Sequence, residues 1–582
     1  MTGEGATLPS ADEGGMRSKN TVLISLGILL VIASLVSTSR IDTIQATGPD
    51  DYPLFYVSHL PPTYFIAVVY LALCSILTKN WKLKVALVLL LALLLEVTPT
   101  IMLANPWVPD QYPFIAESVH LAKDHHVSAY HYLDTTPGLA LTFAGLILVT
   151  NIPPLSLSIL ATFFGVFAAF LVILIGRKMG TDGALCGLLF LAFNFLYQTN
   201  IFHRQTFSFL LFLFSVLILL HLLTSRKSSH SIAYTIVLFA VILTHPGTSA
   251  FLVISLIVAA LGLRVVSKNR ALIYSALLSA VVFVAYNVYV SLWDFRNMIR
   301  FVNGAMNEFL FGDVGQAPGL GYLSGYTQLF STLMNVRLVV VVIFLGLASM
   351  IALNMILKRR GLKSVFVSLL HFGLMMDFMV FMFGGAIYRL RPLLFLIVTS
   401  TILIGCLPIA RIGSSNGGLH LFGRPLPRIS QLLQSKTLRV PLKHVSIGCL
   451  IALLLCLPVL RYSGLPYLHP TSEELSGKLF LDRYYSYDSP IHATEKNLAY
   501  TYSLDLLWLE PKGEPDTILI PEEDPPMNRS FLLVNRYATR DGYWVTNVSF
   551  TEYLEYLLIF LPRSHNLVYQ SDGHDMVFLE RS

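Results

Sequence analysis

The chain has 582 residues, of which 55% are hydrophobic and only 13% are charged, and its formal net charge is +6. A soluble protein carries about 25% charged residues, so this composition excludes an ordinary soluble domain. The apolar residues gather in runs of about 20, the length that crosses a hydrocarbon core of ~30 Å. The basic residues lie in short segments between these runs, which indicates a polytopic α-helical membrane protein and no nucleic-acid partner.

The first part of the chain predicts a tail and then a membrane hairpin. Residues 1–20 are polar and Gly-rich and predict a disordered cytoplasmic tail. The apolar run 21–38 lacks a small-residue cleavage signature, so we expect it to remain as the first span. The loop after it reads PDDYP at residues 49–53, and the same order returns after the third span as PDQYP at residues 109–113.

Thirteen apolar runs are predicted to cross the membrane. They are residues 21–38, 62–78, 85–103, 155–176, 183–200, 206–224, 231–243, 249–263, 271–292, 336–356, 364–383, 392–409 and 445–460. A further run, 138–150, is short and bounded by prolines, and we expect a re-entrant or interfacial helix there.

Basic segments orient a membrane protein, because Lys and Arg concentrate in cytoplasmic loops. The basic segments of this chain are residues 79–84, 177–178, 226–227, 268–270, 358–363 and 411–444. All of them fall on one side of the membrane if the run 138–150 does not cross it. The N-terminus is then cytoplasmic, and the C-terminus lies outside, most simply beyond the cell (plasma) membrane.

Residues 461–582 predict a small extracytoplasmic α/β domain. Their 18 acidic residues outnumber their 10 basic residues, which suits the outer side. Apolar stretches between Pro- and Gly-rich turns predict strands and one short helix. The strands are DTILI, SFLLVN, YWVTNVSF and MVFLE, and the helix is TEYLEYLLIFL. Before this domain, we expect residues 21–84 to form an added hairpin and 85–460 to form the core, with an external loop at 104–137.

Several polar residues fall at the external ends of the spans under this topology. They are Asp110, Tyr112, Arg204, His245, Tyr388, Arg389 and Arg391. An arginine fork binds phosphate oxygens in pairs, and a carboxylate can take a proton from an attacking hydroxyl. The pattern therefore favours chemistry on a lipid-linked phosphate. His245, just before Pro246-Gly247, could equally cap a helix. A single arginine at the end of a span often only extends its side chain to the lipid headgroup region.

The stretch PDQYPFIAESVHLAKDHHVSAYHYLDTTPGLALTFAGLILVTNIPP resembles the first catalytic loop of class-C (GT-C fold) glycosyltransferases, which use polyprenyl-phosphate sugars. The later stretch ILIGRKMGTDGALCGLLFLAFNFLYQTNIFHRQ is similar to the Gly-Arg turn, small-residue helix and external basic residue of that family. The closing LVYQSDGHDMVFLERS resembles the strand pair that ends archaeal and bacterial members.

The resemblance implies that Asp110 activates the acceptor, with Asp51 of the first copy as the other candidate. It implies that Tyr112, Arg204, His245, Tyr388, Arg389 and Arg391 hold the lipid phosphate. Many members carry a paired acid in this loop, whereas residue 112 here is Tyr. A divalent cation, Mg²⁺ or Mn²⁺, is therefore compatible with the resemblance but not required by it. The expected partners are a polyprenyl-phosphate sugar donor, membrane lipids and an unidentified acceptor.

Two other functions stay open from the residues alone. A transporter or flippase of lipid-linked or small anionic substrates should place charges near the midplane. The predicted spans hold Asp377 and His371 as interior ionisable residues, and no repeated halves are visible, which favours surface chemistry. A polytopic assembly subunit without activity is the third function.

Overall fold

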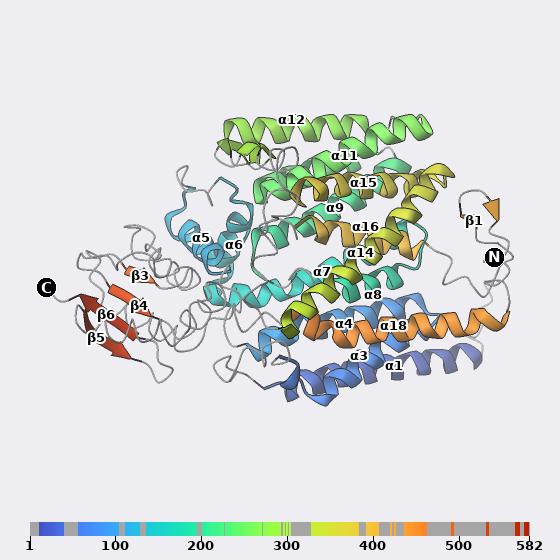
Figure 1. The fold of residues 1–582 in the computed structure, drawn as a ribbon, viewed down its shortest axis with the longest axis horizontal. Helices are drawn as coiled ribbons and strands as arrows, with labels where there is room; N and C mark the ends of the chain where they lie inside the picture. Colours follow the sequence, from blue (N-terminus) through green and yellow to red (C-terminus); the bar gives the residue numbers. More distant parts are fainter. Residues whose placement is uncertain are drawn as a thin grey trace, which may run out of the picture.

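The structure is a computed structural model of the chain. It describes residues 11–39, 56–103, 111–127, 135–194, 199, 201–225, 227–270, 272–292, 295–296, 298–300, 302–303, 328–382, 391–406, 420–421, 424–425, 436–462, 491–493, 531–534, 565–570 and 576–580. In this part of the chain, long helices run side by side to form a bundle, and a small sheet lies beyond one end of it (Figure 1).

The helices of the bundle are α1 (Ala11–Ser37), α3 (Pro62–Leu77), α4 (Trp81–Met102), α5 (Gln111–Asp124), α6 (Gly138–Thr150), α7 (Leu157–Lys178), α8 (Gly183–Phe193), α9 (Arg204–Thr224), α10 (Ser228–Thr244), α11 (Pro246–Ser267), α12 (Ile273–Tyr289), α14 (Gln328–Leu357), α15 (Leu362–Met382), α16 (Arg391–Gly405) and α18 (Lys436–Tyr462). A helix overlaps each of the thirteen predicted spans.

The N-terminal boundary was predicted wrongly. Helix α1 begins at Ala11, so residues 11–20, which we expected in a disordered tail, are helical. The sequence carries a reason, because Ser10 is followed three residues later by Glu13, the spacing of a capping box. This start adds nearly three turns ahead of the apolar run.

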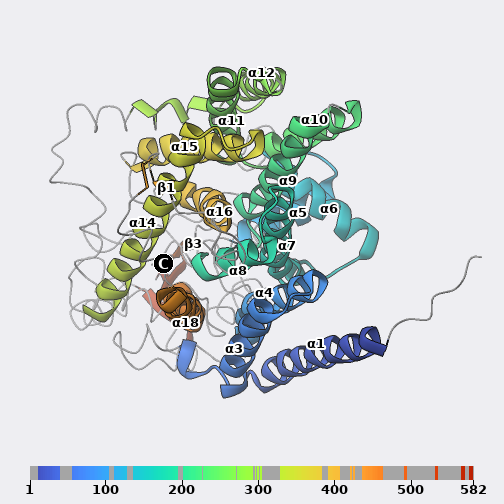
Figure 2. The same cartoon turned by 90° about the vertical axis from the view of Figure 1, so that its right-hand side faces the viewer.

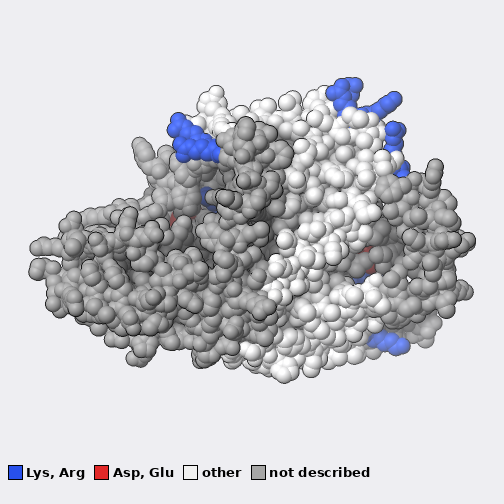
Figure 3. All heavy atoms as spheres, in the orientation of Figure 1, with Lys and Arg blue, Asp and Glu red and all other residues white. Residues whose placement is uncertain are grey.

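Seven of the described helices are long and apolar enough to cross a membrane, judged by length and composition. Seven shorter apolar helices accompany them. In the face shown in Figure 3, an uncharged band covers the helices, and the Lys and Arg side chains of the described residues lie toward the two ends. The protein is therefore an integral, multi-pass membrane protein with a helical core.

The basic turns of the chain meet at one end of the bundle, which we call the basic end. Lys84, in the first turn of α4, forms an ion pair with Asp182, which caps the start of α8. Lys178, at the end of α7, lies 2.9 Å from His221 Nδ1 at the end of α9. Lys363 donates to the Lys178 carbonyl at 2.8 Å. Turns far apart in sequence thus share one face, as the charge pattern predicted.

Helices α4 and α7 run antiparallel, so the end of α4 and the start of α7 lie together at the opposite end, which we call the site end (Figure 1). The chain between them includes α6, which has 13 residues. Because α4 ends and α7 begins at the same end of the bundle, the chain can pass through α6 without crossing the membrane. The geometry agrees with a helix that does not cross.

Close approach of helices depends on small residues, as is usual in membrane bundles. A Cβ on Gly373 of α15 would lie 2.5 Å from Ser255 Cα of α11, and one on Gly262 of α11 would lie 2.6 Å from a Leu369 methyl group. Seen along the bundle, α11 and α15 lie in contact, whereas α1 and α12 lie on the outside (Figure 2). Helix α1 is held to α3 by the Tyr70 hydroxyl, which donates to the Leu23 carbonyl at 2.9 Å.

The described residues after Tyr462 contribute four strands, β3 (Ile491–Ala493), β4 (Phe531–Val534), β5 (His565–Gln570) and β6 (Met576–Glu580). Their order is β3-β4-β6-β5. Strand β3 is parallel to β4, and the other pairs are antiparallel.

The predicted strands SFLLVN and MVFLE and the closing strand pair are therefore confirmed. The predicted strands DTILI and YWVTNVSF and the predicted helix TEYLEYLLIFL lie outside the described residues. The basic segment 411–444 contributes two short strands, β1 (His420–Leu421) and β2 (Arg424–Pro425), which pair with each other.

We predict that the two ends of the bundle face opposite sides of the membrane. A cysteine at His420, in the basic segment, should be shielded in intact cells from an impermeant thiol reagent. A cysteine at Val127, which is exposed after α5, should be labelled. Equal labelling at both positions, or the reverse pattern, would contradict this topology. The unmodified chain, with its five native cysteines, sets the background.

Candidate functional site

The predicted site residues are described to different extents. Asp110, Tyr388 and Arg389 lie outside the described residues, as does Asp51. Tyr112 lies in the first turn of α5, and Arg391 opens α16. Arg204 and His245 are described with their side-chain contacts.

Helix α5 begins at Gln111, directly after Asp110, and its first turn is anchored inside the protein. The Gln111 side chain is fully buried, and its Oε1 accepts a hydrogen bond of 2.9 Å from the Phe202 N–H, 91 residues away. One turn on, the Phe114 ring meets the His203 ring edge to face at 4.6 Å. This anchoring fixes the first turn of α5 against the segment that precedes α9.

Arg204 is the first residue of α9. His203 caps this helix, because its Nδ1 accepts from the Gln205 N–H. The Arg204 guanidinium lies 5.5 Å from the centre of the Phe114 ring and donates to Thr136 Oγ1 at 2.7 Å. A helix N-terminus and a guanidinium both favour anions. The start of α9 is therefore a cationic position beside α5.

Residues 135–138 (Thr-Thr-Pro-Gly) connect this cation to other elements. The Tyr286 hydroxyl of α12 donates to the Thr135 carbonyl at 2.7 Å. Gly138 begins α6 so close to α10 that a Cβ there would lie 2.5 Å from Thr244 Oγ1. This segment thus places Arg204, the end of α10 and the end of α12 around one point at the site end.

His245 is a helix cap, which is one of the two roles that the sequence allowed. It stands between α10 and α11, and its Nδ1 accepts from the Thr248 N–H at 3.0 Å. Thr248 Oγ1 lies 2.8 Å from Ser208 Oγ of α9. The side chain is only 4% exposed. Its role in binding substrate stays a prediction.

Among the described residues, three buried polar atoms at the starts of α5 and α9 have no hydrogen-bond partner. They are Gln111 Nε2, Gln205 Nε2 and Thr206 Oγ1. Each belongs to a residue no more than 1% exposed. Native proteins leave few such atoms unsatisfied, so these atoms are available to a ligand or to ordered water.

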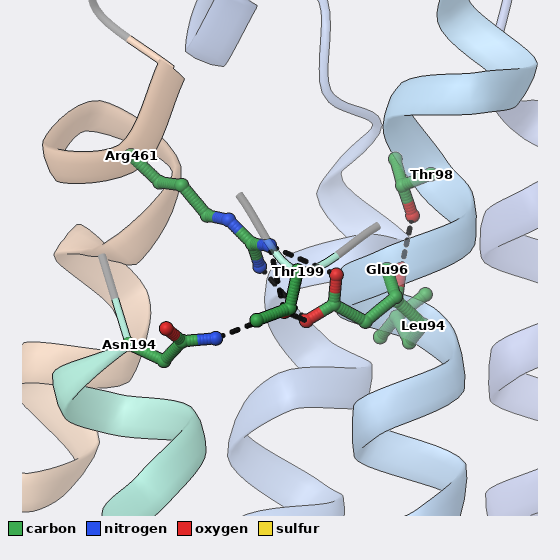
Figure 4. A network of polar contacts seen from close by, with 6 residues as sticks. All are labelled: Leu94, Glu96, Thr98, Asn194, Thr199 and Arg461. Carbon is green, nitrogen blue, oxygen red and sulfur yellow. Dashed lines mark hydrogen bonds and ion pairs between the residues drawn. The ribbon is translucent and has the colours of Figure 1, made fainter. Parts of the chain in front are cut away.

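A buried ion pair joins α4 to α18 at the site end (Figure 4). Arg461 Nη1 and Nη2 donate to Glu96 Oε1 and Oε2, each at 2.9 Å. Thr199 Oγ1 donates to Glu96 Oε1 at 3.3 Å and accepts from Asn194 Nδ2 at 2.9 Å and from Arg461 Nη2 at 3.3 Å. The two charged side chains are 1–2% exposed.

This ion pair was missed from the sequence. The predicted spans were taken to hold only Asp377 and His371 as ionisable residues, but Glu96 lies in one of them and Arg337 in another. One acid in the leucine-rich run of α4 changes the hydropathy little. The signal that could have found it is the cost of an ionisable residue at membrane depth, which implies a partner.

The two residues that the sequence did single out behave differently. His371 in α15 is satisfied by hydroxyls on both sides, with Ser349 Oγ at 3.0 Å and Thr399 Oγ1 at 2.9 Å. Asp377, two turns on, is 3% exposed, and its Oδ2 has no hydrogen-bond partner in the structure. His371 therefore connects α14, α15 and α16, and nothing in the structure assigns Asp377 a role.

No group of three or more His, Cys, Asp or Glu side chains that could hold a metal ion occurs among the described residues. Asp110 and Asp51 lie outside that part of the chain. The described donors therefore do not form a site for Mg²⁺ or Mn²⁺, and the expectation of a divalent cation stays untested.

The chain is similar in structure to ArnT from Cupriavidus metallidurans bound to undecaprenyl phosphate, with a TM-score of 0.49 and 12% identity, over 87% of this chain and 99% of that chain. It is similar to the oligosaccharyltransferase AglB from Archaeoglobus fulgidus in complex with an inhibitory peptide and a dolichol-phosphate (TM-score 0.47, 13% identity, 73% of this chain and 63% of that chain). For the apo form of the Archaeoglobus fulgidus enzyme, the TM-score is 0.48 at 10% identity, over 91% of this chain and 75% of that chain.

No family model matches the chain, and no curated protein matches it in sequence. TM-scores below 0.5 at these identities carry no argument about activity. Function therefore has to be argued from the residues of this chain.

We predict that Gly165→Ala destabilises the protein. A Cβ at this position of α7 would lie 2.4 Å from Glu96 Cδ, so the carboxylate must move away from Arg461. Overpacking a core costs about 1–3 kcal/mol. Gly145→Ala is the matched control, because a Cβ there meets nothing within 4 Å and alanine favours helix. Thermal unfolding in detergent measures both, and equal melting temperatures would contradict the prediction.

We also predict that Gln111→Met loosens the start of α5. It leaves the buried Phe202 N–H without an acceptor, which costs about 1–3 kcal/mol. Amide hydrogen exchange at Phe202 should become faster. Gln111→Glu keeps an acceptor oxygen at the same reach, so its Phe202 amide should stay protected. Unchanged exchange in Gln111→Met would show that the hydrogen bond does not hold this segment.

Proposed function

We propose that the protein is an integral-membrane glycosyltransferase of the class-C (GT-C) type. It moves a sugar from a polyprenyl-phosphate donor to an acceptor on the extracytoplasmic side, with inversion at the anomeric carbon. One observation carries the proposal. The helix that directly follows Asp110 packs through Gln111 and Phe114 against the segment that presents Arg204. This packing supports the inference that the acid-bearing loop and the cation act together at the site end.

In this proposal Asp110 is the general base. Its carboxylate takes the proton of an acceptor hydroxyl as the acceptor oxygen attacks the anomeric carbon. A base placed in this way contributes about 10²–10⁴-fold to a rate. The bond between that carbon and the phosphate oxygen breaks with its electron pair on the phosphate, so a glycosidic bond forms and the lipid phosphate leaves.

The leaving phosphate gains negative charge in this step, and fixed cations at that position lower the barrier. Arg204 is the described cation, and its Thr136 and Phe114 contacts hold the guanidinium in place. Arg389 and Arg391 are assigned to the same phosphate, with Tyr112, Tyr388 and His245 around it. Any divalent cation would add positive charge here.

The proposed topology has thirteen crossings, with α6 lying at the external side without crossing. The basic end faces the cytoplasm, because its turns carry Lys and Arg. The site end and the domain formed by residues 461–582 face outward, in the cell (plasma) membrane. The donor therefore reaches the site from the outer leaflet.

The test is sugar transfer by purified protein from a panel of polyprenyl-phosphate sugars. We predict that Asp110→Asn remains folded and loses at least about 10²-fold in kcat, because the base is gone while the shape is kept. Arg391→Ala should raise KM for the donor, since a phosphate contact is lost. Asp51→Asn is the control for the first copy of the motif and should transfer normally.

The opposite pattern is equally informative. Normal transfer by Asp110→Asn with loss in Asp51→Asn would move the base to the first copy. A wild-type protein that consumes no donor, with or without Mg²⁺ or Mn²⁺, would contradict the enzyme and favour transport of a lipid-linked or small anionic substrate.

A further inference from the structure

Four basic side chains from four helices gather at the basic end of the bundle, and we call them the basic cluster. They are Lys178, the last residue of α7; His221, in the last turn of α9; His230, in the first turn of α10; and Lys363, the second residue of α15. Figure 2 shows α9 between α7 and α10. Residues up to 185 positions apart in the sequence therefore meet in this cluster.

The contacts inside the cluster leave donors unused. Lys178 Nζ lies 2.9 Å from His221 Nδ1. An ammonium group only donates, so Nδ1 is the acceptor and His221 carries its ring hydrogen on Nε2. Lys363 Nζ donates to the Lys178 carbonyl at 2.8 Å, and the ring centres of His221 and His230 are 5.3 Å apart. Each ammonium group has three hydrogens, so both lysines keep N–H donors that these bonds do not use.

The cluster holds positive charge without a carboxylate to compensate it. None of its members forms an ion pair with an acidic side chain among the described residues. The side-chain charges that act on His221 come from Lys178, His230 and Lys363. All four side chains are half-buried, so their mutual repulsion is screened less than it is between fully exposed charges. A bound anion would remove this repulsion.

Membrane orientation and helix capping do not require this arrangement. Basic residues that mark a membrane face or favour a helix C-terminus commonly extend toward water, and the exposed Arg177 and Lys82 fit that description. Lys178 instead turns to an imidazole, and Lys363 reaches from another helix to the end of α7. The side chains are thus directed to one another, which is typical of a binding site.

The cluster lies at the level of lipid headgroups and above exposed aromatic side chains. Helices α7 and α9 are long and apolar enough to cross a membrane, so their ends lie near its surface, whichever side the basic end faces. Phe214 precedes His221 by about two turns and Phe167 precedes Lys178 by about three, so each pair shares one helix face. Phe214 is 46% exposed and Phe167 57% exposed. These rings can therefore contact an acyl chain below the cluster.

We propose that the basic cluster binds the phosphate group of an anionic membrane lipid, with an acyl chain along the seam between α7 and α9. The ammonium groups of Lys178 and Lys363 and the His221 Nε2–H are the donors. Phosphate suits them because its oxygens accept several charge-assisted hydrogen bonds at once, and basic pockets between membrane helices are known to bind such headgroups. Free phosphate offers the same chemistry without the acyl chain. This site lies at the opposite end of the bundle from Arg204 and does not depend on the proposed function.

Displacement of fluorescent phosphatidic acid from the purified full-length protein in neutral detergent tests the site. The competitors are phosphatidic acid, phosphatidylcholine with the same acyl chains, and inorganic phosphate. We expect phosphatidic acid to bind at least about tenfold more tightly than phosphatidylcholine, because its phosphate carries no attached cation. Inorganic phosphate should bind more weakly than phosphatidic acid, since it gains no apolar contact. Equal affinity for the two lipids overturns the proposal, and inorganic phosphate that binds as tightly as phosphatidic acid overturns the lipid source.

Lysine variants test the cluster itself. Lys178→Met and Lys363→Met each remove one ammonium group at similar length, and each should weaken phosphatidic acid binding at least about tenfold, a difference of 1.4 kcal/mol. Lys178→Arg keeps the charge and should keep the preference for phosphatidic acid. Lys82→Met is the matched control, because it removes an exposed lysine at the same end and should bind as wild type does. An equal loss in Lys82→Met would show only diffuse attraction to positive charge and would overturn the site.

A last variant separates the two sources of phosphate. Phe214→Ala removes an exposed ring and should weaken phosphatidic acid binding while leaving inorganic phosphate binding unchanged. Unchanged affinity for both ligands would overturn the acyl-chain contact. If a lysine variant fails to fold, this substitution and the comparison of the two lipids on the wild-type chain still decide the proposal.

Discussion

Two parallel hydrogen bonds of 2.9 Å between Arg461 and Glu96 hold the last helix of the bundle to the third span of the chain. Removing one partner of a buried ion pair leaves the other charge buried without compensation, which lowers the stability of the folded protein by about 3–5 kcal/mol. This pair therefore keeps two residues that are 365 positions apart in the sequence next to each other. This contact fixes α18 against α4 at the site end of the bundle.

The two ends of the bundle use polar residues differently. At the basic end, ion pairs and hydrogen bonds such as Lys84–Asp182 and Lys363 to the Lys178 carbonyl connect turns to each other. At the site end, the long-range hydrogen bonds reach into the protein interior, as that of the buried Gln111 side chain to the Phe202 N–H does. Several buried polar atoms there remain unsatisfied, as expected where a polar ligand completes the site.

The arrangement around Arg204 gives the proposed chemistry a physical basis. A guanidinium that rests on an aromatic ring and donates to a threonine keeps its direction when a phosphate approaches. Little reorganisation is then needed during the reaction, which is what makes fixed cations effective. The Thr135–Gly138 segment matters for the same reason, because it connects Arg204 with α10 and α12.

The spans and their grouping into a basic and an opposite end could be predicted, because the hydrocarbon core demands about 20 apolar residues per crossing and Lys and Arg mark the turns. The closing strand pair was implied by the resemblance to class-C glycosyltransferases. The start of α1 was predicted wrongly, since its Ser10–Glu13 signal is local and was overlooked. Asp110 and Arg389 remain predictions, since they lie outside the described residues.

The sequence by itself determined which segments form apolar helices and which turns gather at the basic end. Only the tertiary structure decided that Glu96 pairs with Arg461, that Gln111 anchors α5 on Phe202, and that His245 caps a helix. The reason is physical. The hydropathy of a segment can be read from that segment alone. A hydrogen bond or ion pair between side chains depends on how helices far apart in sequence pack against one another.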